Sequence, residues 1–371
     1  MKDISIPVAE PALVGNERHY VMDCLDSNWI SSNGKYIKKF EDGFGQLCAA
    51  EHAVSCSNGT VALHLALLAL GVGPGDEVIV PTLTFVSTAN AVAYCGAKPV
   101  FIDSENETWN MDVELIEGQI TENTKAIIAV HLYGHPVDMD SVMAIARRHD
   151  IAVIEDAAEA HGAQYKGRPV GAIGDIGTFS FYGNKVLTTG EGGMVVTNNE
   201  HIASDVRLLR GQGMDPERRY WFTVIGYNYR LTNIAAAIGV GQLEKIEWHL
   251  ARRREVADAY ARCLSGVAEV SVQPEMPWAR NVYWMNSLVL GEKIDISRDE
   301  LASELAEHGI ETRPFFVPMH ELPMYQNEDE SRRFVVAERL SRQGLSLPSS
   351  ASLEISQVEW ICDRIKIAIA G

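Results

Sequence analysis

Residues 126–156 read AIIAVHLYGHPVDMDSVMAIARRHDIAVIED, and this stretch decides the fold class. Residues 126–131 and 152–155 are continuous apolar runs, which are typical of strands buried on both faces. Residues 139–149 between them have a helical pattern. The order strand, helix, strand predicts an α/β sheet covered by helices. Similar apolar runs predict further strands at residues 77–80, 99–103, 178–181 and 194–197.

The pattern changes after about residue 235. Residues 60–70 predict a buried helix in the first part of the chain, whereas residues 234–264 predict a long charged helix that is broken once. Further helices are expected at residues 298–308 and 354–369, and a strand at residues 282–289. We therefore predict a large domain over residues 1–249, with a mixed, mostly parallel sheet, and a smaller α/β domain over residues 250–371.

Composition narrows the class of partner. The chain has 371 residues, is 46% hydrophobic, and carries a formal net charge of −18. This charge disfavours nucleic acid as a partner and repels other anions unless local cations bind them.

The N-terminal segment resembles no secretory signal, and no apolar run is long enough to span a membrane, so the cytoplasm is the expected location. The six cysteines form no C-x-x-C pair and the histidines form no H-E-x-x-H, so no metal site is expected.

A lysine follows one of the predicted strands. Residues 177–185 read GTFSFYGNK, and a glycine-rich turn comes after Lys185. A lysine amine in a crowded site can form a Schiff base with an aldehyde, because desolvation and neighbouring cations lower its pKa. The same pattern is also typical of a surface lysine in a loop.

Two adjacent carboxylates, Glu155 and Asp156, end another predicted strand. The carboxyl ends of strands in an open α/β sheet line ligand crevices, and a carboxylate there can pair with a protonated pyridine nitrogen. An aspartate that caps a helix explains the position equally well.

A turn with small polar residues opens the predicted helix at 60–70. Ser57-Asn58-Gly59-Thr60 supplies capping side chains, and the helix N-terminus has the N–H groups and dipole to hold a phosphate. Most such turns only cap a helix. Together with Phe85 at another strand end, these segments describe a phosphate cradle, an aromatic side chain, an acid and a lysine.

In this order the motifs resemble those of the DegT/DnrJ/EryC1/StrS sugar aminotransferases, which are fold-type-I enzymes. The similarity runs from about residue 5 to the C-terminus. It is carried by Ser57-Asn-Gly-Thr60, Pro81-Thr-Leu-Thr-Phe85, Glu155-Asp156-Ala-Ala-Glu159, Phe179-Ser180-Phe-Tyr-Gly-Asn-Lys185 and Gly190-Glu-Gly-Gly193.

The resemblance implies pyridoxal phosphate as cofactor, borne by Lys185 through a Schiff base. Asp156 would meet the pyridine nitrogen and Phe85 would stack on the ring. Glu159 would lie near the phenolic oxygen, where one of the two groups should carry a proton because a carboxylate and a phenolate repel each other. The expected phosphate ligands are Ser57, Gly59, Thr60 and Ser180, with Asn228 of the partner subunit, which implies a homodimer with a composite active site.

The implied reaction moves an amino group from L-glutamate to C4 of GDP-4-keto-6-deoxymannose, in the synthesis of O-antigen or a related cell-surface sugar. The alternative is a 4- or 3-aminotransferase that acts on a UDP- or dTDP-linked keto sugar, and only loop resemblance near residues 28–32 and 210–221 separates the two. The candidate substrate contacts are Trp29, Ser31, Tyr182, Arg219, Arg313 and His320. For His320, packing is as good an explanation as function.

Overall fold

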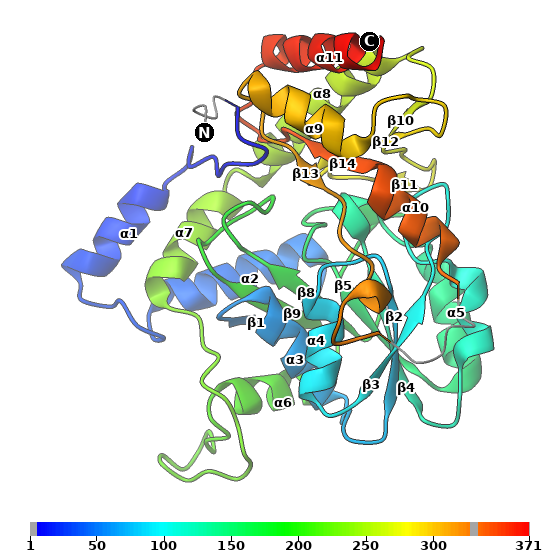
Figure 1. The fold of residues 1–371 in the computed structure, drawn as a ribbon. Helices are drawn as coiled ribbons and strands as arrows, with labels where there is room; N and C mark the ends of the chain where they lie inside the picture. Colours follow the sequence, from blue (N-terminus) through cyan, green and yellow to red (C-terminus); the bar gives the residue numbers. More distant parts are fainter. Residues whose placement is uncertain (1–5, 327–332, 371) are drawn as a thin grey trace.

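The computed structural model describes residues 6–326 and 333–370, and the core of this part of the chain is a seven-stranded sheet (Figure 1). Its strands are β1 (His52–Cys56), β2 (Glu77–Pro81), β3 (Lys98–Ile102), β4 (Thr124–Val130), β5 (Ala152–Asp156), β8 (Ile176–Ser180) and β9 (Gly193–Thr197). The strand order is β1-β9-β8-β5-β4-β2-β3. The run from β8 to β3 is parallel, whereas β9 is antiparallel to both of its neighbours. The sheet is thus mixed and mostly parallel, as predicted.

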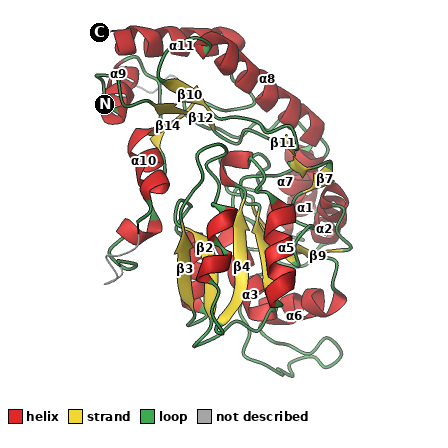
Figure 2. Ribbon diagram, turned by 90° about the vertical axis from the view of Figure 1, so that its right-hand side faces the viewer, coloured by secondary structure: helices red, strands yellow, loops and turns green. Residues whose placement is uncertain are grey.

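Helices cover this sheet and explain its continuous apolar runs. Helix α3 (Gly59–Ala69) packs against β8 and β9, and α5 (Met139–His149) packs against β4 and β5 (Figure 2). Each predicted strand between residues 77 and 197 overlaps one of these strands. Because side chains alternate across a strand, Glu155 and Asp156 point to opposite faces of the sheet.

The remaining elements of the N-terminal two thirds surround this sheet. The helices are α1 (Glu17–Asp26), α2 (Lys35–Cys48), α4 (Ser87–Tyr94), α6 (Glu200–Arg210) and α7 (Asn233–Leu243), with 3₁₀ turns η1 (Val113–Leu115), η2 (Glu117–Gln119) and η3 (Leu132–Gly134). A small sheet joins β6 (Gln164–Tyr165) and β7 (Arg168–Pro169) to the distant β11 (Ala279–Arg280). The chain after α7 therefore returns to pair with the β6–β7 hairpin of the N-terminal two thirds.

A second, antiparallel sheet forms near the C-terminus, with the order β10-β12-β14-β13. The elements of this region are α8 (Ile246–Leu264), β10 (Val270–Val272), β12 (Asn286–Leu290), α9 (Arg298–Glu307), β13 (Arg313–Pro314), η4 (Met319–Glu321), α10 (Val335–Gln343), β14 (Gly344–Leu347) and α11 (Ile355–Ala370). Helix α11 packs against α8 and α9 at one end of the molecule (Figure 1). The long helix predicted at 234–264 is α7 followed by α8, with the expected single break.

The strand predicted at residues 282–289 begins only at Asn286. The N–H groups of Val282 and Trp284 instead donate to the carbonyls of Gly134 and Tyr133, so residues 282–285 dock onto η3 and join no strand ladder. This docking carries a part of the C-terminal third into the core around the first sheet.

Buried apolar side chains form two clusters in the described residues. One surrounds the seven-stranded sheet and includes Trp284 and Leu340; the other surrounds the second sheet and includes Val256 and Ile361. The division into domains at residues 249 and 250 stays a prediction. Among the helices that the structure describes, none combines the length and apolar character needed to cross a membrane.

Candidate active site

The N-terminus of α3 lies close against the end of β8. The side-chain oxygen of Asn58 caps the helix by accepting a hydrogen bond from the Val61 N–H at 3.0 Å. A Cβ atom at Gly59 would come within 2.7 Å of the Ser180 Cβ, so glycine permits this close approach. The first N–H groups of a helix lack partners within the helix. With the hydroxyls of Thr60 and Ser180 beside them, they form a cradle that fits a phosphate.

Neighbouring contacts hold this cradle in place. The hydroxyls of Thr60 and Ser87 share a hydrogen bond of 2.7 Å, which joins the first turns of α3 and α4. The N–H of Ser57 donates to the Tyr229 carbonyl at 2.8 Å. The fold thus gathers Ser57, Gly59, Thr60 and Ser180 at one helix end.

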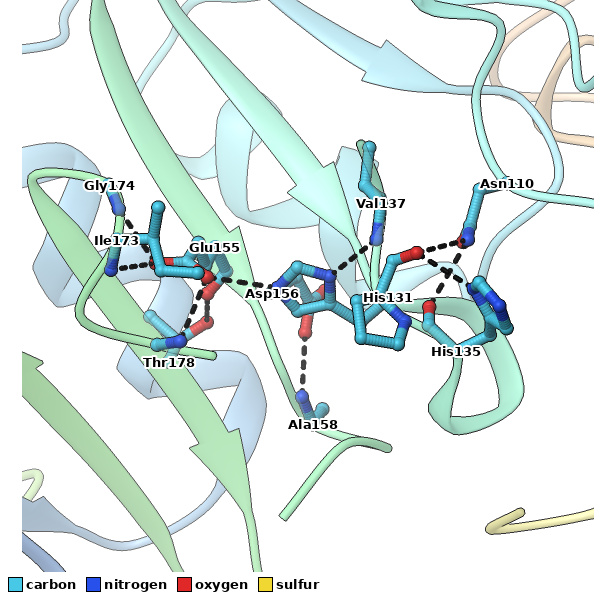
Figure 3. Close-up of polar contacts among 12 residues, drawn as sticks. Asn110, His131, His135, Val137, Glu155, Asp156, Ala158, Ile173, Gly174 and Thr178 are labelled. Carbon is cyan, nitrogen blue, oxygen red and sulfur yellow. Dashed lines mark hydrogen bonds and ion pairs between the residues drawn. The ribbon is translucent and has the colours of Figure 1, made fainter. Parts of the chain in front are cut away.

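Asp156 lies at the end of β5 (Figure 3) and its side chain is buried. Its carboxylate accepts hydrogen bonds from the Thr88 hydroxyl at 2.9 Å and from the Ala158 N–H at 3.2 Å. A turn and not a helix follows the strand, so Asp156 is no helix cap. Burial raises the pKa of Asp156, and no ion pair of the described residues includes it. A buried carboxylate that lacks a cation at contact distance fits a protonated pyridine nitrogen.

Glu155 belongs to a different network on the opposite face of β5 (Figure 3). His131 accepts the Val137 N–H on Nδ1 at 3.1 Å, so its Nε2 carries the hydrogen and donates to Glu155 at 3.1 Å. The same carboxylate accepts the N–H groups of Gly171, Ile173 and Gly174. These bonds outweigh the desolvation that opposes them and lower the pKa of Glu155. Glu155 therefore anchors the 171–174 turn, and only Asp156 faces the site.

The side chain of Lys185 is buried beside a carboxylate and an indole ring. Its Nζ lies 3.6 Å from Oε1 of Glu159 and 3.7 Å from the centre of the Trp284 ring. The other carboxylate oxygen of Glu159 accepts the Tyr133 N–H at 2.7 Å. Burial lowers the pKa of Lys185 and raises that of Glu159 to about 7. Lys185 is thus no surface lysine, and its environment favours a reactive neutral amine.

Two aromatic residues that the sequence singled out are exposed. Phe85 is 55% exposed, and its ring centre lies 5.8 Å from that of Phe316. Tyr182 is 52% exposed, and its carbonyl accepts the Lys185 N–H at 2.9 Å. Phe85 therefore has a free face for a flat ligand.

Arg313 and His320 come from the C-terminal third. The charge of Arg313 lies close enough to Lys185 to add to the lowering of its pKa by burial. His320 is packed: its Nδ1 and the Thr82 hydroxyl are 2.7 Å apart, and its ring stacks on Phe334 at 4.2 Å between centres. These contacts favour packing as the explanation of His320, and a substrate contact stays a prediction.

Trp29 and Ser31 lie in a loop before α2. Their carbonyls accept hydrogen bonds from the side chain and the backbone N–H of Asn233, at 2.7 and 2.6 Å. Among the contacts between described residues, no hydrogen bond, ion pair or ring contact links either of them to Lys185.

Arg219 and Asn228 lie in the long segment between α6 and α7, which projects from the body in Figure 1. The Arg219 guanidinium lies 4.9 Å from the Tyr220 ring centre, and Asn228 forms a backbone bridge with Gly211. Both side chains are exposed. Within the described part of one chain, neither has a hydrogen bond, ion pair or ring contact with Lys185.

The sequence alone did not predict that Trp284 borders Lys185, or that Tyr133 bonds to Glu159 and Trp284 beside it. Tyr133 lies in η3 with a φ of 54°, the left-handed region that few non-glycine residues adopt. Trp284 donates its Nε1–H to the Asn184 carbonyl at 2.8 Å, across 100 positions of sequence. An isolated tryptophan in an apolar run carries no signal for such a contact.

The fold and the site together define a class of protein, an α/β enzyme with a buried lysine opposite a buried carboxylate at the ends of its strands. Residues 11–366 match the model of the DegT/DnrJ/EryC1/StrS aminotransferase family, and the chain belongs to this family. The resemblance inferred from the motifs is thereby confirmed.

Characterised relatives match along almost the whole chain. The chain is 50% identical to the GDP-perosamine synthase of Caulobacter vibrioides, over 96% of both proteins. It is 51% identical to the GDP-perosamine synthase of Escherichia coli O157:H7, over 97% of both. Among solved structures, a putative sugar aminotransferase from Streptococcus pneumoniae in its PLP form has a TM-score of 0.92 and 28% identity, over 98% of both chains.

Proposed function

We propose that this aminotransferase moves an amino group from L-glutamate to C4 of GDP-4-keto-6-deoxymannose, giving GDP-perosamine and 2-oxoglutarate. The observation that carries the choice of sugar is the identity of 50–51% with two GDP-perosamine synthases over at least 96% of each protein. Pyridoxal phosphate is the cofactor, and the S. pneumoniae relative in its PLP form supports it.

Different residues bind the ring nitrogen, the ring face and the phosphate of the cofactor. When bound, pyridoxal phosphate supplies an aldehyde for amino groups and a ring that accepts the electron pair left by deprotonation. Asp156 keeps the pyridine nitrogen protonated, and Phe85 covers the ring with its exposed face. The proposed phosphate ligands are Ser57, Gly59, Thr60 and Ser180.

Lys185 carries the proton transfers. As a neutral amine it takes the α-proton of L-glutamate and delivers it to the cofactor's C4′ carbon, and for the sugar it moves a proton in the reverse direction. Glu159 lies 3.6 Å from this amine and can share its proton. Burial of the Lys185 side chain lowers the pKa of its amine, which favours the neutral form.

The substrates are anions, and the net charge of −18 repels them at long range. Local cations must therefore bind the carboxylates of L-glutamate and the diphosphate of the sugar. Arg313, near Lys185, and Arg219, in the projecting segment, are the proposed ligands because guanidinium groups pair well with such oxyanions. Trp29, Ser31 and Tyr182 remain proposed sugar contacts, whereas His320 is better explained by packing.

A homodimer completes this proposal. The segment that holds Arg219 and Asn228 exposes a row of large apolar side chains, Tyr220, Trp221, Phe222, Val224 and Ile225, the last 90% exposed. Such a surface favours a protein interface. We propose that it packs on a second copy of the chain and brings Asn228 to the phosphate in the partner's site. A cytoplasmic location and a role in O-antigen or related sugar synthesis remain predictions.

The test is a product assay with purified enzyme, pyridoxal phosphate, L-glutamate and each of three keto sugars, linked to GDP, UDP or dTDP. Products are identified by mass spectrometry and NMR, and the Lys185→Ala variant is the control. We expect the GDP sugar to gain an amine at C4 with the manno configuration. Preference for a UDP- or dTDP-linked sugar, or an amine at C3, would assign the chain to the alternative reaction.

A further inference from the structure

The Lys185 amine lies close to a carboxylate and to the face of an indole ring. The carboxylate of Glu159 is 3.6 Å from Nζ, and the ring centre of Trp284 is 3.7 Å from it. Both attract a cation, the carboxylate by its charge and the indole face by its quadrupole. We propose that Trp284 is a positioning residue: with Glu159, its ring face supports the cation that the released Lys185 amine becomes once it has taken a proton. This inference rests on the proposed function, in which Lys185 is released and re-bonded in every cycle.

Three hydrogen bonds fix the indole of Trp284 in this position. The Nε1–H donates to the Asn184 carbonyl at 2.8 Å, next to the lysine itself. The backbone N–H donates to the Tyr133 carbonyl at 3.1 Å, and the backbone carbonyl accepts from the buried guanidinium of Arg253 at 2.9 Å. Because both the ring edge and the backbone are held, the ring face cannot turn away when Lys185 is released.

Tyr133 is hydrogen-bonded to both Glu159 and Trp284, the two groups beside the Lys185 amine. Its N–H donates to Oε2 of Glu159 at 2.7 Å, and its carbonyl accepts from Trp284. Its ring lies roughly parallel to the indole, at 6.3 Å between centres and 23° between planes. The left-handed φ of 54° turns the N–H and the carbonyl toward these two partners. The carboxylate and the indole are therefore positioned from one point of the backbone.

Titratable groups from several elements surround the Lys185 amine. They are Asp156 on β5, Glu159 and His161 in the turn after it, and Arg313 on β13. Burial lowers the pKa of Lys185 most; Glu159 and Asp156 raise it, and Arg313 lowers it further. Burial lowers the pKa of His161 to about 3, so this histidine is neutral. The indole face thus acts on the cation beside two carboxylates that raise the pKa of Lys185 and one guanidinium that lowers it.

The inference can be tested on the enzyme without cofactor. Lysines are labelled with trace acetic anhydride between pH 6 and 11, and peptide mass spectrometry follows Lys185 against the exposed Lys293 as reference. In Trp284→Leu, we expect the pKa of Lys185 to fall by about one pH unit, equivalent to about tenfold more neutral amine. In Trp284→Phe, which keeps a smaller ring face, the pKa of Lys185 should fall by less. In Glu159→Gln, the pKa of Lys185 should also fall. Trp248→Leu on α8 is the matched control and should leave it unchanged.

An unchanged or raised Lys185 pKa in Trp284→Leu would overturn the inference, because a merely structural tryptophan would not support the cation. If the leucine variant does not fold, Trp284→Phe carries the test, and there too an unchanged pKa contradicts it. The labelling uses neither cofactor nor sugar, so a wrong choice of sugar leaves it untouched. Conversely, failure of the cofactor to attach to Lys185 would remove the proposed function whatever the labelling gave.

Discussion

At the scale of single residues, the candidate site depends on two buried groups, Lys185 and Asp156. The sequence predicts that these two residues share a site because each comes at or after the end of a strand, and the carboxyl ends of β5 and β8 lie side by side in the sheet. Trp284 and Tyr133 did not follow, because a contact across 100 or more positions depends on how residues 282–285 dock onto η3. The sequence therefore predicted the reacting groups but not their surroundings.

The Asp156→Asn variant should bind cofactor but react slowly. Its amide can keep the bonds with Thr88 and Ala158, while the charge that protonates the pyridine nitrogen is lost. We expect kcat to fall by about 100-fold or more, the size seen when one electrostatic partner of a reaction is removed. The check is the rate of the half-reaction with L-glutamate alone. A rate near that of the wild type would remove Asp156 from the mechanism.

The same substitution should stabilise the enzyme without cofactor. Burial raises the pKa of Asp156 above its ordinary 3.8, so folding takes up a proton and stability falls as pH rises through the folded pKa. At neutral pH the buried carboxylate therefore destabilises the folded enzyme, and asparagine avoids this effect. Urea unfolding of both proteins at pH 7 and pH 4 checks this. The advantage of the variant should shrink at the lower pH, and a destabilised variant at pH 7 would contradict the argument.

At the scale of elements, the apolar runs of the parallel strands were predictable because helices cover β4, β5 and their neighbours. Strand β1 was not predicted. It lies at the edge of the sheet, and its Ser55 breaks the apolar run by bonding through its N–H and hydroxyl to Glu41. An edge strand that uses side chains as partners has no continuous hydrophobic pattern.

The cradle at the start of α3 predicts a local effect. Gly59→Ala would place a Cβ within 2.7 Å of the Ser180 Cβ and push the helix end away from β8. We expect pyridoxal phosphate to bind about tenfold more weakly, which corresponds to about 1.4 kcal/mol. Gly183→Ala is the matched control, since a Cβ there meets nothing within 4 Å. Titration of both variants with cofactor measures the difference; equal affinities would rule out the cradle as the phosphate site.

At the scale of the whole molecule, the segment between α6 and α7 exposes a row of large apolar side chains to solvent. The proposed second copy of the chain would cover these aromatic residues and receive Asn228, and the sequence suggests this copy through resemblance and not through pattern. A composite active site is therefore a prediction about the dimer and not about one chain.

Mixed dimers test whether Asn228 of one chain serves the active site of the other. Co-expression of Asn228→Ala with Lys185→Ala chains gives mixed dimers in which, if Asn228 serves the partner's site, one site has both changes and the other has neither. Random mixing should then restore about a quarter of the wild-type activity, although each variant alone is nearly inactive. If Asn228 acts within its own chain, each mixed dimer has two damaged sites, and activity should not exceed the average of the two variants.

The measurement that tests the central claim most directly is reductive trapping of the cofactor. The enzyme with pyridoxal phosphate is treated with borohydride, digested, and its peptides are sequenced by mass spectrometry. We predict a single phosphopyridoxyl group on Lys185 in the wild type, none in Lys185→Ala, and its loss from the wild type when L-glutamate is added first. A group attached to another lysine, or none at all, would contradict the assignment of Lys185 as the cofactor-bearing and proton-transferring residue.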